Sequence, residues 1–287
     1  MRPEPGASGK ISEMIGTRLV AFATVASVIT PLIAACGVPA RREQSAATVV
    51  PAVVSGPVMA RPATADPRIG AVFPGSDTVH SCTASVLDSL SGNLIITAAH
   101  CLDSSVESLF APAYSGDPDT TDFWRVDAVY VDPRWVQHQD PSADVAIARV
   151  SRVDQRGQGT LEQRAGGGFV LGSAPGPDVD ITVTGYPTGE GGVPVSCSGQ
   201  TVNPERGFPA VLCGGLTDGT SGAPWVSGTM VRGVIGGLQG GGCDYSDVSY
   251  SAPFDLQIRM LFQRAQLGGP GDHDSGAPDD GCAAATP

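Results

Sequence analysis

Residues 94–101 read LIITAAHC, an apolar, β-branched run that ends in small residues, a histidine and a cysteine. A short run of this composition favours a buried strand. His100 follows directly on that strand and is a candidate general base. A single histidine of this kind is more often a hydrogen-bonded structural residue, so its role depends on what the rest of the chain supplies.

Two other segments supply complementary chemistry. DVAIARV at 144–150 begins an apolar strand with an acid, and DGTSGAPW at 218–225 places glycines on both sides of a serine. Serine is a weak nucleophile at neutral pH, so acyl transfer needs an imidazole to take its proton and a buried carboxylate to fix the imidazole tautomer. His100, Asp144 and Ser221 form such a set, although each alone could be structural.

These segments resemble the trypsin and chymotrypsin family of serine peptidases, especially its bacterial branch, over about residues 69–265. TAAHC at 97–101 matches the family's histidine motif, DVAI at 144–147 its acid motif, and GTSGAP at 219–224 its nucleophile motif with substitutions. The order His, Asp, Ser and the intervals of 44 and 77 residues also fit. The resemblance implies an all-β fold of two six-stranded antiparallel β-barrels with a C-terminal helix.

The composition agrees with an all-β fold. The 287 residues include 38 Gly and 24 Pro, and only 16% are charged, which favours short elements joined by tight turns. Asp255 can cap a helix that ends before Gly268, with apolar residues at helical spacing between them. Strand signals cover residues 78–87, 93–97, 124–131, 144–150, 180–186, 193–202, 209–212, 230–238 and 248–252.

The beginning of the chain indicates export. Lys10 and Arg18 precede an uncharged run over 19–33, which has the length of a signal-peptide core. The following IAACG resembles the bacterial lipoprotein signal, which implies a lipid anchor at Cys36 and a place on the outer face of the cell membrane. The alternative is an ordinary signal cleaved nearby, which would give a secreted protein.

We therefore divide the chain into four parts. Residues 1–35 are a lipoprotein-type signal peptide, and 36–66 are the lipidated cysteine with a flexible tether or pro-segment. Residues 67–265 form the peptidase domain, and 266–287 are a flexible tail. The net charge of -12 and the absence of a basic stripe argue against a nucleic-acid partner.

Six cysteines remain after Cys36, an even number that is typical of disulfides in an oxidising compartment. No C-x-x-C occurs, so no metal site is expected. The family resemblance implies the pair Cys82–Cys101. For the other four we favour Cys197–Cys213 and Cys243–Cys282, with Cys213–Cys243 as the rival pairing.

The resemblance also assigns roles. Ser221 attacks the scissile carbonyl, His100 acts as base and then as acid, and Asp144 orients the imidazole. The backbone N–H groups of Gly219 and Ser221 form the oxyanion hole. Thr220 stands where animal members carry an aspartate that pairs with a new N-terminus, so activity should not depend on releasing such an amine.

For the specificity pocket, the resemblance places Gly215 at the base, Gly236, Gly237 and Leu238 along one wall, and Tyr250 nearby. Because the base carries no acid, cleavage after Arg or Lys is disfavoured and an apolar P1 residue is expected. The substrates are polypeptides, the protein is a monomer, and no cofactor is implied. Two alternatives stay open: a surface binding protein that has lost catalysis, and an esterase with the same triad.

The remaining histidines have simpler explanations. His80, His138 and His273 are expected at the surface or in hydrogen bonds. The three tryptophans are expected in or at the edge of the core, because large aromatic residues dominate burial.

Overall fold

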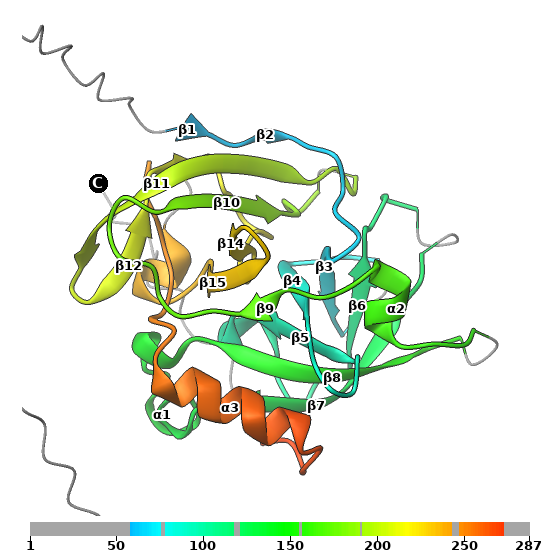
Figure 1. The fold of residues 1–287 in the computed structure, drawn as a ribbon. Coiled ribbons are helices and arrows are strands. Elements are labelled where there is room, and N and C mark those ends of the chain that lie inside the picture. Colours follow the sequence, from blue (N-terminus) through cyan, green and yellow to red (C-terminus); the bar gives the residue numbers. More distant parts are fainter. Residues whose placement is uncertain are drawn as a thin grey trace, which may run out of the picture. The chain divides into compact units, whose positions relative to one another are not determined.

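A computed structural model describes residues 58–75, 78–117, 121–154, 157–189, 191–242 and 247–272. Cys36, Cys243, His273 and Cys282 lie outside the described residues, together with the expected signal peptide and most of the tether. The described chain falls into two halves, each built on β-strands (Figure 1).

The first half is a closed barrel with the strand order β3-β4-β5-β8-β7-β6. All neighbouring strands in it run antiparallel. Its strands are β3 (Ile69–Pro74), β4 (Cys82–Leu87), β5 (Leu94–Thr97), β6 (Ser108–Pro112), β7 (Trp124–Val131) and β8 (Ala146–Arg152).

The second half is an eight-stranded sheet with the order β16-β12-β11-β10-β14-β15-β9, in which β2 also pairs with β11. A separate two-stranded pair joins β1 to β13. The strands are β1 (Val58–Met59), β2 (Arg61–Pro62), β9 (Val170–Leu171), β10 (Asp180–Gly185), β11 (Val195–Glu205), β12 (Phe208–Val211), β13 (Cys213–Gly214), β14 (Pro224–Ser227), β15 (Met230–Val234) and β16 (Ser249–Tyr250).

Helices are few and short. They are η1 (Ala99–Cys101), α1 (Pro133–His138), η3 (Pro141–Ala143), α2 (Leu161–Ala165), η4 (Leu238–Gly241) and α3 (Leu256–Gln266). Asp255 caps α3 as expected, by accepting from the backbone N–H of Gln257 and Ile258. Within the described residues, no helix is both long enough and apolar enough to span a bilayer.

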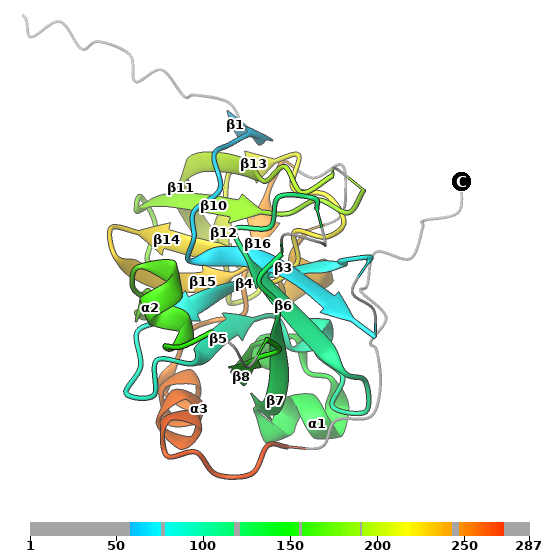
Figure 2. The same cartoon turned by 90° about the vertical axis from the view of Figure 1, so that its right-hand side faces the viewer.

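Three buried hydrophobic clusters form the core of the domain. One lies within the first barrel and contains Trp124 and Trp135, and a second lies within the second sheet around Trp225. The third joins residues of both halves, including Ile147 and Val234, to the apolar face of α3. Thus the last helix packs on the first barrel although it follows the second sheet in sequence (Figure 2).

The chain entering the domain is tied to the second sheet. β1 pairs with β13, β2 pairs with β11, and Ala60 N–H donates to the carbonyl of Gly214 at 2.8 Å. At the other end, Asp272 N–H donates to Val129 O, also at 2.8 Å. The packed chain therefore extends beyond the range 67–265 expected from sequence at both ends.

The all-β, trypsin-like fold with its C-terminal helix is confirmed, and the tryptophans are buried as predicted. The second sheet contains the six strands β10 to β12 and β14 to β16, to which β9 and β2 are added. His80 differs from the expectation: its side chain is buried against Phe73, Tyr114 and Tyr186, and its Nδ1 has no hydrogen-bond partner among the described residues. The sequence missed this because two of the aromatic neighbours, Tyr114 and Tyr186, come from distant segments.

Candidate active site

Strand register brings His100 to Asp144. β5 and β8 are antiparallel, and Thr97 at the end of β5 lies opposite Ala146 at the start of β8. His100 follows that end of β5 by one short turn, and Asp144 precedes that start of β8. The two residues are 44 apart in sequence, yet His100 Nδ1 lies 2.8 Å from Asp144 Oδ2.

Asp144 is buried and receives three N–H donors. Besides the imidazole Nδ1, its Oδ1 accepts from the backbone N–H of His100 at 3.0 Å, and its Oδ2 accepts from the backbone N–H of Gly237 at 2.8 Å. Burial alone would raise the pKa of Asp144, but the charge and hydrogen bonds of His100 and the amide of Gly237 outweigh it, so this pKa is lowered from its ordinary value. The carboxylate is therefore ionised and can fix Nδ1 as the protonated ring nitrogen.

The segment that carries Ser221 lies against the same end of the first barrel. The backbone N–H of Thr83, at the start of β4, donates to Ser221 O at 2.7 Å. A Cβ on Gly222 would stand 2.0 Å from Thr97 Oγ1 and 2.2 Å from Thr83 O, so only glycine, here with φ of +79°, permits this approach. Ser221 is thus attached beside the strand end that leads to His100.

A hydrogen bond fixes the orientation of the peptide group before Gly219. In a trans peptide the C=O of one residue and the N–H of the next point in opposite directions. Thr188 N–H holds Asp218 O at 2.8 Å, so Gly219 N–H points away from Thr188. Gly219 has φ of +91°, and a Cβ there would stand 2.4 Å from Thr188 N, which explains why this position is glycine.

The same argument applies to Ser221. Ala223 N–H donates to Thr220 O at 2.9 Å, so Ser221 N–H, in the same peptide group, points away from Ala223 N. The amides of Thr220, Gly222 and Ala223 all donate to backbone carbonyls. By contrast, the N–H groups of Gly219 and Ser221 have no acceptor within the described part of the chain.

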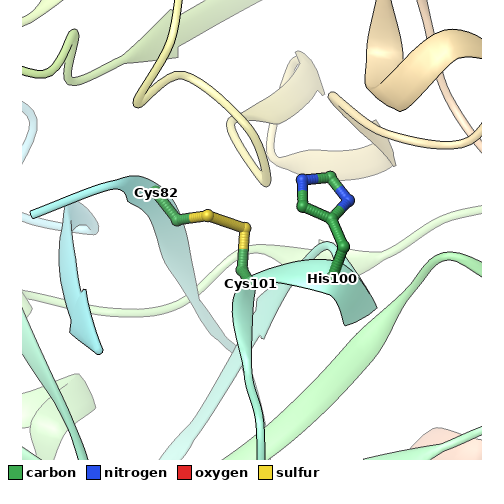
Figure 3. Close-up of side chains that lie close together, drawn as sticks. All are labelled: Cys82, His100 and Cys101. Carbon is green, nitrogen blue, oxygen red and sulfur yellow. A yellow bond between two sulfur atoms is a disulfide. The ribbon is translucent and has the colours of Figure 1, made fainter. Parts of the chain in front are cut away.

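Figure 3 shows the neighbourhood of His100. Cys82 and Cys101 form a disulfide with their Cα atoms 5.9 Å apart, and the imidazole projects away from it toward the second half of the chain. Potential ligand atoms of these three residues lie within 4.8 Å of one another. Because both sulfurs are used in the disulfide, they are not thiolate ligands for a metal ion.

Both described disulfides match the pairings favoured from sequence, Cys82–Cys101 and Cys197–Cys213. The second pairing leaves no place for the rival Cys213–Cys243. The expected pair Cys243–Cys282 lies outside the described residues.

The predicted pocket residues fall into two groups. Gly236 lies at the site itself, since a Cβ there would stand 2.8 Å from Asp144 Oδ2, and Gly237 donates to the same oxygen. Tyr250 O accepts from Gly236 N–H at 3.2 Å, and Leu238 begins η4 directly afterwards. Gly215 instead contacts the entering chain, because its Cβ would stand 3.1 Å from Met59 Cε.

Sequence reasoning missed the role of Thr83 and Thr188, whose bonds hold the turn around Ser221. Thr83 is fully buried, and its hydroxyl donates to Gly219 O and accepts from Tyr186 N–H, each at 2.9 Å. A polar residue next to a cysteine near the start of a buried strand was the available signal. It did not reveal the partner, which lies 136 residues away.

This domain is all-β, and its two halves meet at a carboxylate-bound histidine and a glycine-rich turn that carries a serine. That combination is typical of trypsin-like peptidase domains. The chain belongs to this family, because residues 82–236, more than half of its length, match the family model described as a trypsin-like peptidase domain. Comparison with curated protein sequences gives no significant match.

Solved structures show the same fold. The protease Anisep from Arthrobacter nicotinovorans aligns with a TM-score of 0.62 and 21% identity, over 72% of this chain and 99% of that chain. A thermostable serine protease, AL20, from an extremophilic microorganism gives 0.61 and 23%, over 71% and 99%. Human heparin binding protein gives 0.57 and 14%, over 74% and 98%. The fold is thus shared by two proteases and a protein that is named for heparin binding.

Proposed function

We propose that this chain is a serine endopeptidase that uses His100, Asp144 and Ser221. The observation that carries the proposal is the 2.8 Å contact between Asp144 Oδ2 and His100 Nδ1, which leaves Nε2 as the unprotonated nitrogen of the ring. A structural histidine would not need a buried, ionised carboxylate beside a turn that presents two backbone N–H groups.

The chemistry follows from these groups. Ser221 Oγ attacks the carbonyl carbon of the peptide bond while His100 Nε2 takes the hydroxyl proton, and the carbonyl oxygen becomes an oxyanion. The N–H groups of Gly219 and Ser221 donate to that oxyanion. His100 then gives the proton to the leaving amine, the C–N bond breaks, and an acyl-enzyme remains. Water, deprotonated by His100, releases the acid and regenerates Ser221.

Activity should not require a newly cut N-terminus. Thr220, which is 1% exposed, uses its hydroxyl to donate to Thr217 O at 2.7 Å. The turn before Ser221 is therefore held by neutral bonds within the domain, and no carboxylate awaits an amine at this position.

We propose an apolar P1 preference. Gly215, which the family resemblance places at the pocket base, carries no charge. A cationic side chain buried at that base would lack a counter-charge. Matched peptide substrates with Phe, Leu or Arg at P1 test this, and a higher kcat/KM for Arg would contradict it.

We also propose export and a lipid anchor at Cys36, on the strength of the leader sequence. Two or more acyl chains on one cysteine give stable membrane attachment. Wild-type protein should take up a fatty-acid probe and sediment with membranes, and Cys36→Ala should do neither. Equal membrane association of both would exclude the anchor.

The catalytic proposal is tested with Ser221→Ala. Peptide hydrolysis and covalent labelling by a fluorophosphonate should both disappear, while the melting temperature stays near that of the wild type. Labelling that survives in Ser221→Ala would remove Ser221 from its role. Matched amide and ester substrates separate a peptidase from an esterase, since only the peptidase hydrolyses both.

A further inference from the structure

We infer that Thr83 is a positioning residue for the oxyanion hole, acting through its buried hydroxyl. The inference rests on the proposed peptidase function and goes beyond it, because Thr83 does not touch the substrate. Its effect would pass through Gly219 and Ser221, the residues whose N–H groups face the reacting oxygen.

Thr83 contacts both donor residues. Its hydroxyl donates to Gly219 O at 2.9 Å and its backbone N–H donates to Ser221 O at 2.7 Å. Its own carbonyl accepts from Thr97 Oγ1 at 2.7 Å. One residue of β4 therefore binds the carbonyl that follows each proposed oxyanion donor.

These bonds complete a set of restraints. The peptide group before Gly219 is held by Thr188 N–H on Asp218 O, and the peptide group after it is held by the Thr83 hydroxyl. A peptide group is planar, so fixing both neighbours of a residue fixes its φ and ψ. Glycine is the residue with the widest choice of these angles, so Gly219 is the point where the turn would otherwise rotate.

The hydroxyl also joins the turn to its neighbouring segment. A threonine hydroxyl has one proton to donate and lone pairs to accept with, and here it donates to Gly219 O while accepting from Tyr186 N–H at 2.9 Å. Thr83 is fully buried, so water cannot replace either bond. Valine has the same shape and can make neither bond, whereas serine can make both.

Thr83→Val should therefore lower kcat by about 10- to 100-fold with KM changed by less than about twofold. Loss of one oxyanion donor costs about 10² to 10³ in a comparable protease, and a donor that is loosened but still present should cost less. Thr83→Ser should restore most of the rate. Affinity for a peptide aldehyde, whose adduct oxygen occupies the oxyanion position, should fall in Thr83→Val by a factor similar to kcat.

Thr201 provides a matched control in the second sheet. It is also buried, and its hydroxyl likewise donates to a backbone carbonyl, Gly176 O at 2.6 Å, and accepts from a backbone amide, Val179 N at 3.0 Å. Thr201→Val should lower the melting temperature but leave kcat unchanged. Rates are normalised to the folded fraction, and Thr83→Ala replaces Thr83→Val if the valine variant does not fold.

The outcomes are distinct. A selective loss of kcat in Thr83→Val, restored by serine and absent from Thr201→Val, supports the inference. Wild-type kcat in Thr83→Val, or an equal loss in the valine and serine variants, overturns it while Ser221→Ala still reports on the peptidase function. A wild type that neither cleaves peptides nor takes up the fluorophosphonate removes the function and this inference together.

Discussion

The backbone N–H of Gly237 donates to Oδ2 of Asp144 at 2.8 Å, across 93 residues of sequence. Asp144 belongs to the first barrel, and Gly237 follows the last long strand of the second sheet. The same oxygen binds His100 Nδ1, so the carboxylate that orients the imidazole also ties the two halves together. Position 237 needs glycine, because its φ is +81° and a Cβ there would stand 2.8 Å from Ala252 N.

Asp144→Asn should lower kcat by about 10⁴ with little change in fold. Both carboxylate oxygens of Asp144 accept hydrogen bonds from N–H groups. In the Asn variant an NH2 group replaces one of these oxygens, so it either faces another N–H donor or forces His100 into its other tautomer. Steady-state kinetics at pH 7 measure the effect. Asp132→Asn is the control, because Asp132 is also buried but pairs with Arg134 at the start of α1. A loss below tenfold in Asp144→Asn would contradict the proposed role.

Removal of either described disulfide should cost about 3 kcal/mol of unfolding free energy, because their sequence separations of 19 and 16 residues are similar. The effects on kcat should differ. The Cys82/Cys101 pair adjoins both Thr83 and His100, so its double Ala variant should also lose activity. The double Ala variant of Cys197 and Cys213 should retain kcat per folded molecule. Denaturant titration and kinetics on both variants decide this.

Protein stability should fall as the pH is lowered below about 6.5, partly because of His80. Burial lowers the pKa of His80, so in the folded state it stays neutral while the unfolded chain takes up a proton. Above the unfolded pKa both states are neutral and His80 makes no difference. Between the two pKa values the unfolded state gains up to about 1.4 kcal/mol per pH unit.

The variant His80→Phe tests this, because Phe keeps a ring against Phe73 and Tyr114 but cannot titrate. Its urea midpoint should change less than that of the wild type between pH 7.5 and pH 5.5. Identical pH profiles for wild type and His80→Phe would show that the buried histidine does not contribute.

The entering strands should be needed for full stability, whereas the residues before them should not be needed for activity. A chain that begins at Val58 should have the kcat of one that begins further upstream. A chain that begins at Thr64 loses the bonds of Ala60 to Gly214 O and of Ala63 to Pro194 O, each worth about 1 kcal/mol. It also uncovers Gly215, so its melting temperature and its activity should both decrease.

Comparison of the three chains in the same assay separates these effects. If activity appears only when one particular N-terminal residue is exposed, the turn around Thr220 depends on an amine after all. If the chain beginning at Thr64 is as stable as the longer chains, β1 and β2 are not structural parts of the domain.

Local sequence was sufficient for the strands whose apolar runs are long and bounded by turn residues. Trp124–Val131 has the bounds expected, and α3 starts after the predicted cap, Asp255. Short strands were missed where the run is small, as in Pro224–Ser227. The two-residue strand Val58–Met59 was also missed, because it exists only through pairing with a distant strand.

By itself, the sequence determined the family and the identity of His100, Asp144 and Ser221 as candidates, because each of these depends on residue types in a short motif. The pair Cys82–Cys101 followed from the family resemblance, whereas Cys197–Cys213 had a rival until the structure decided it. Tertiary structure alone decided that Gly237 binds Asp144, that Thr83 holds the turn around Ser221, and that His80 is buried among aromatic rings. The physical reason is that hydrogen-bond partners and burial are set by strand register and by the packing of the two halves, which bring together residues up to 136 positions apart.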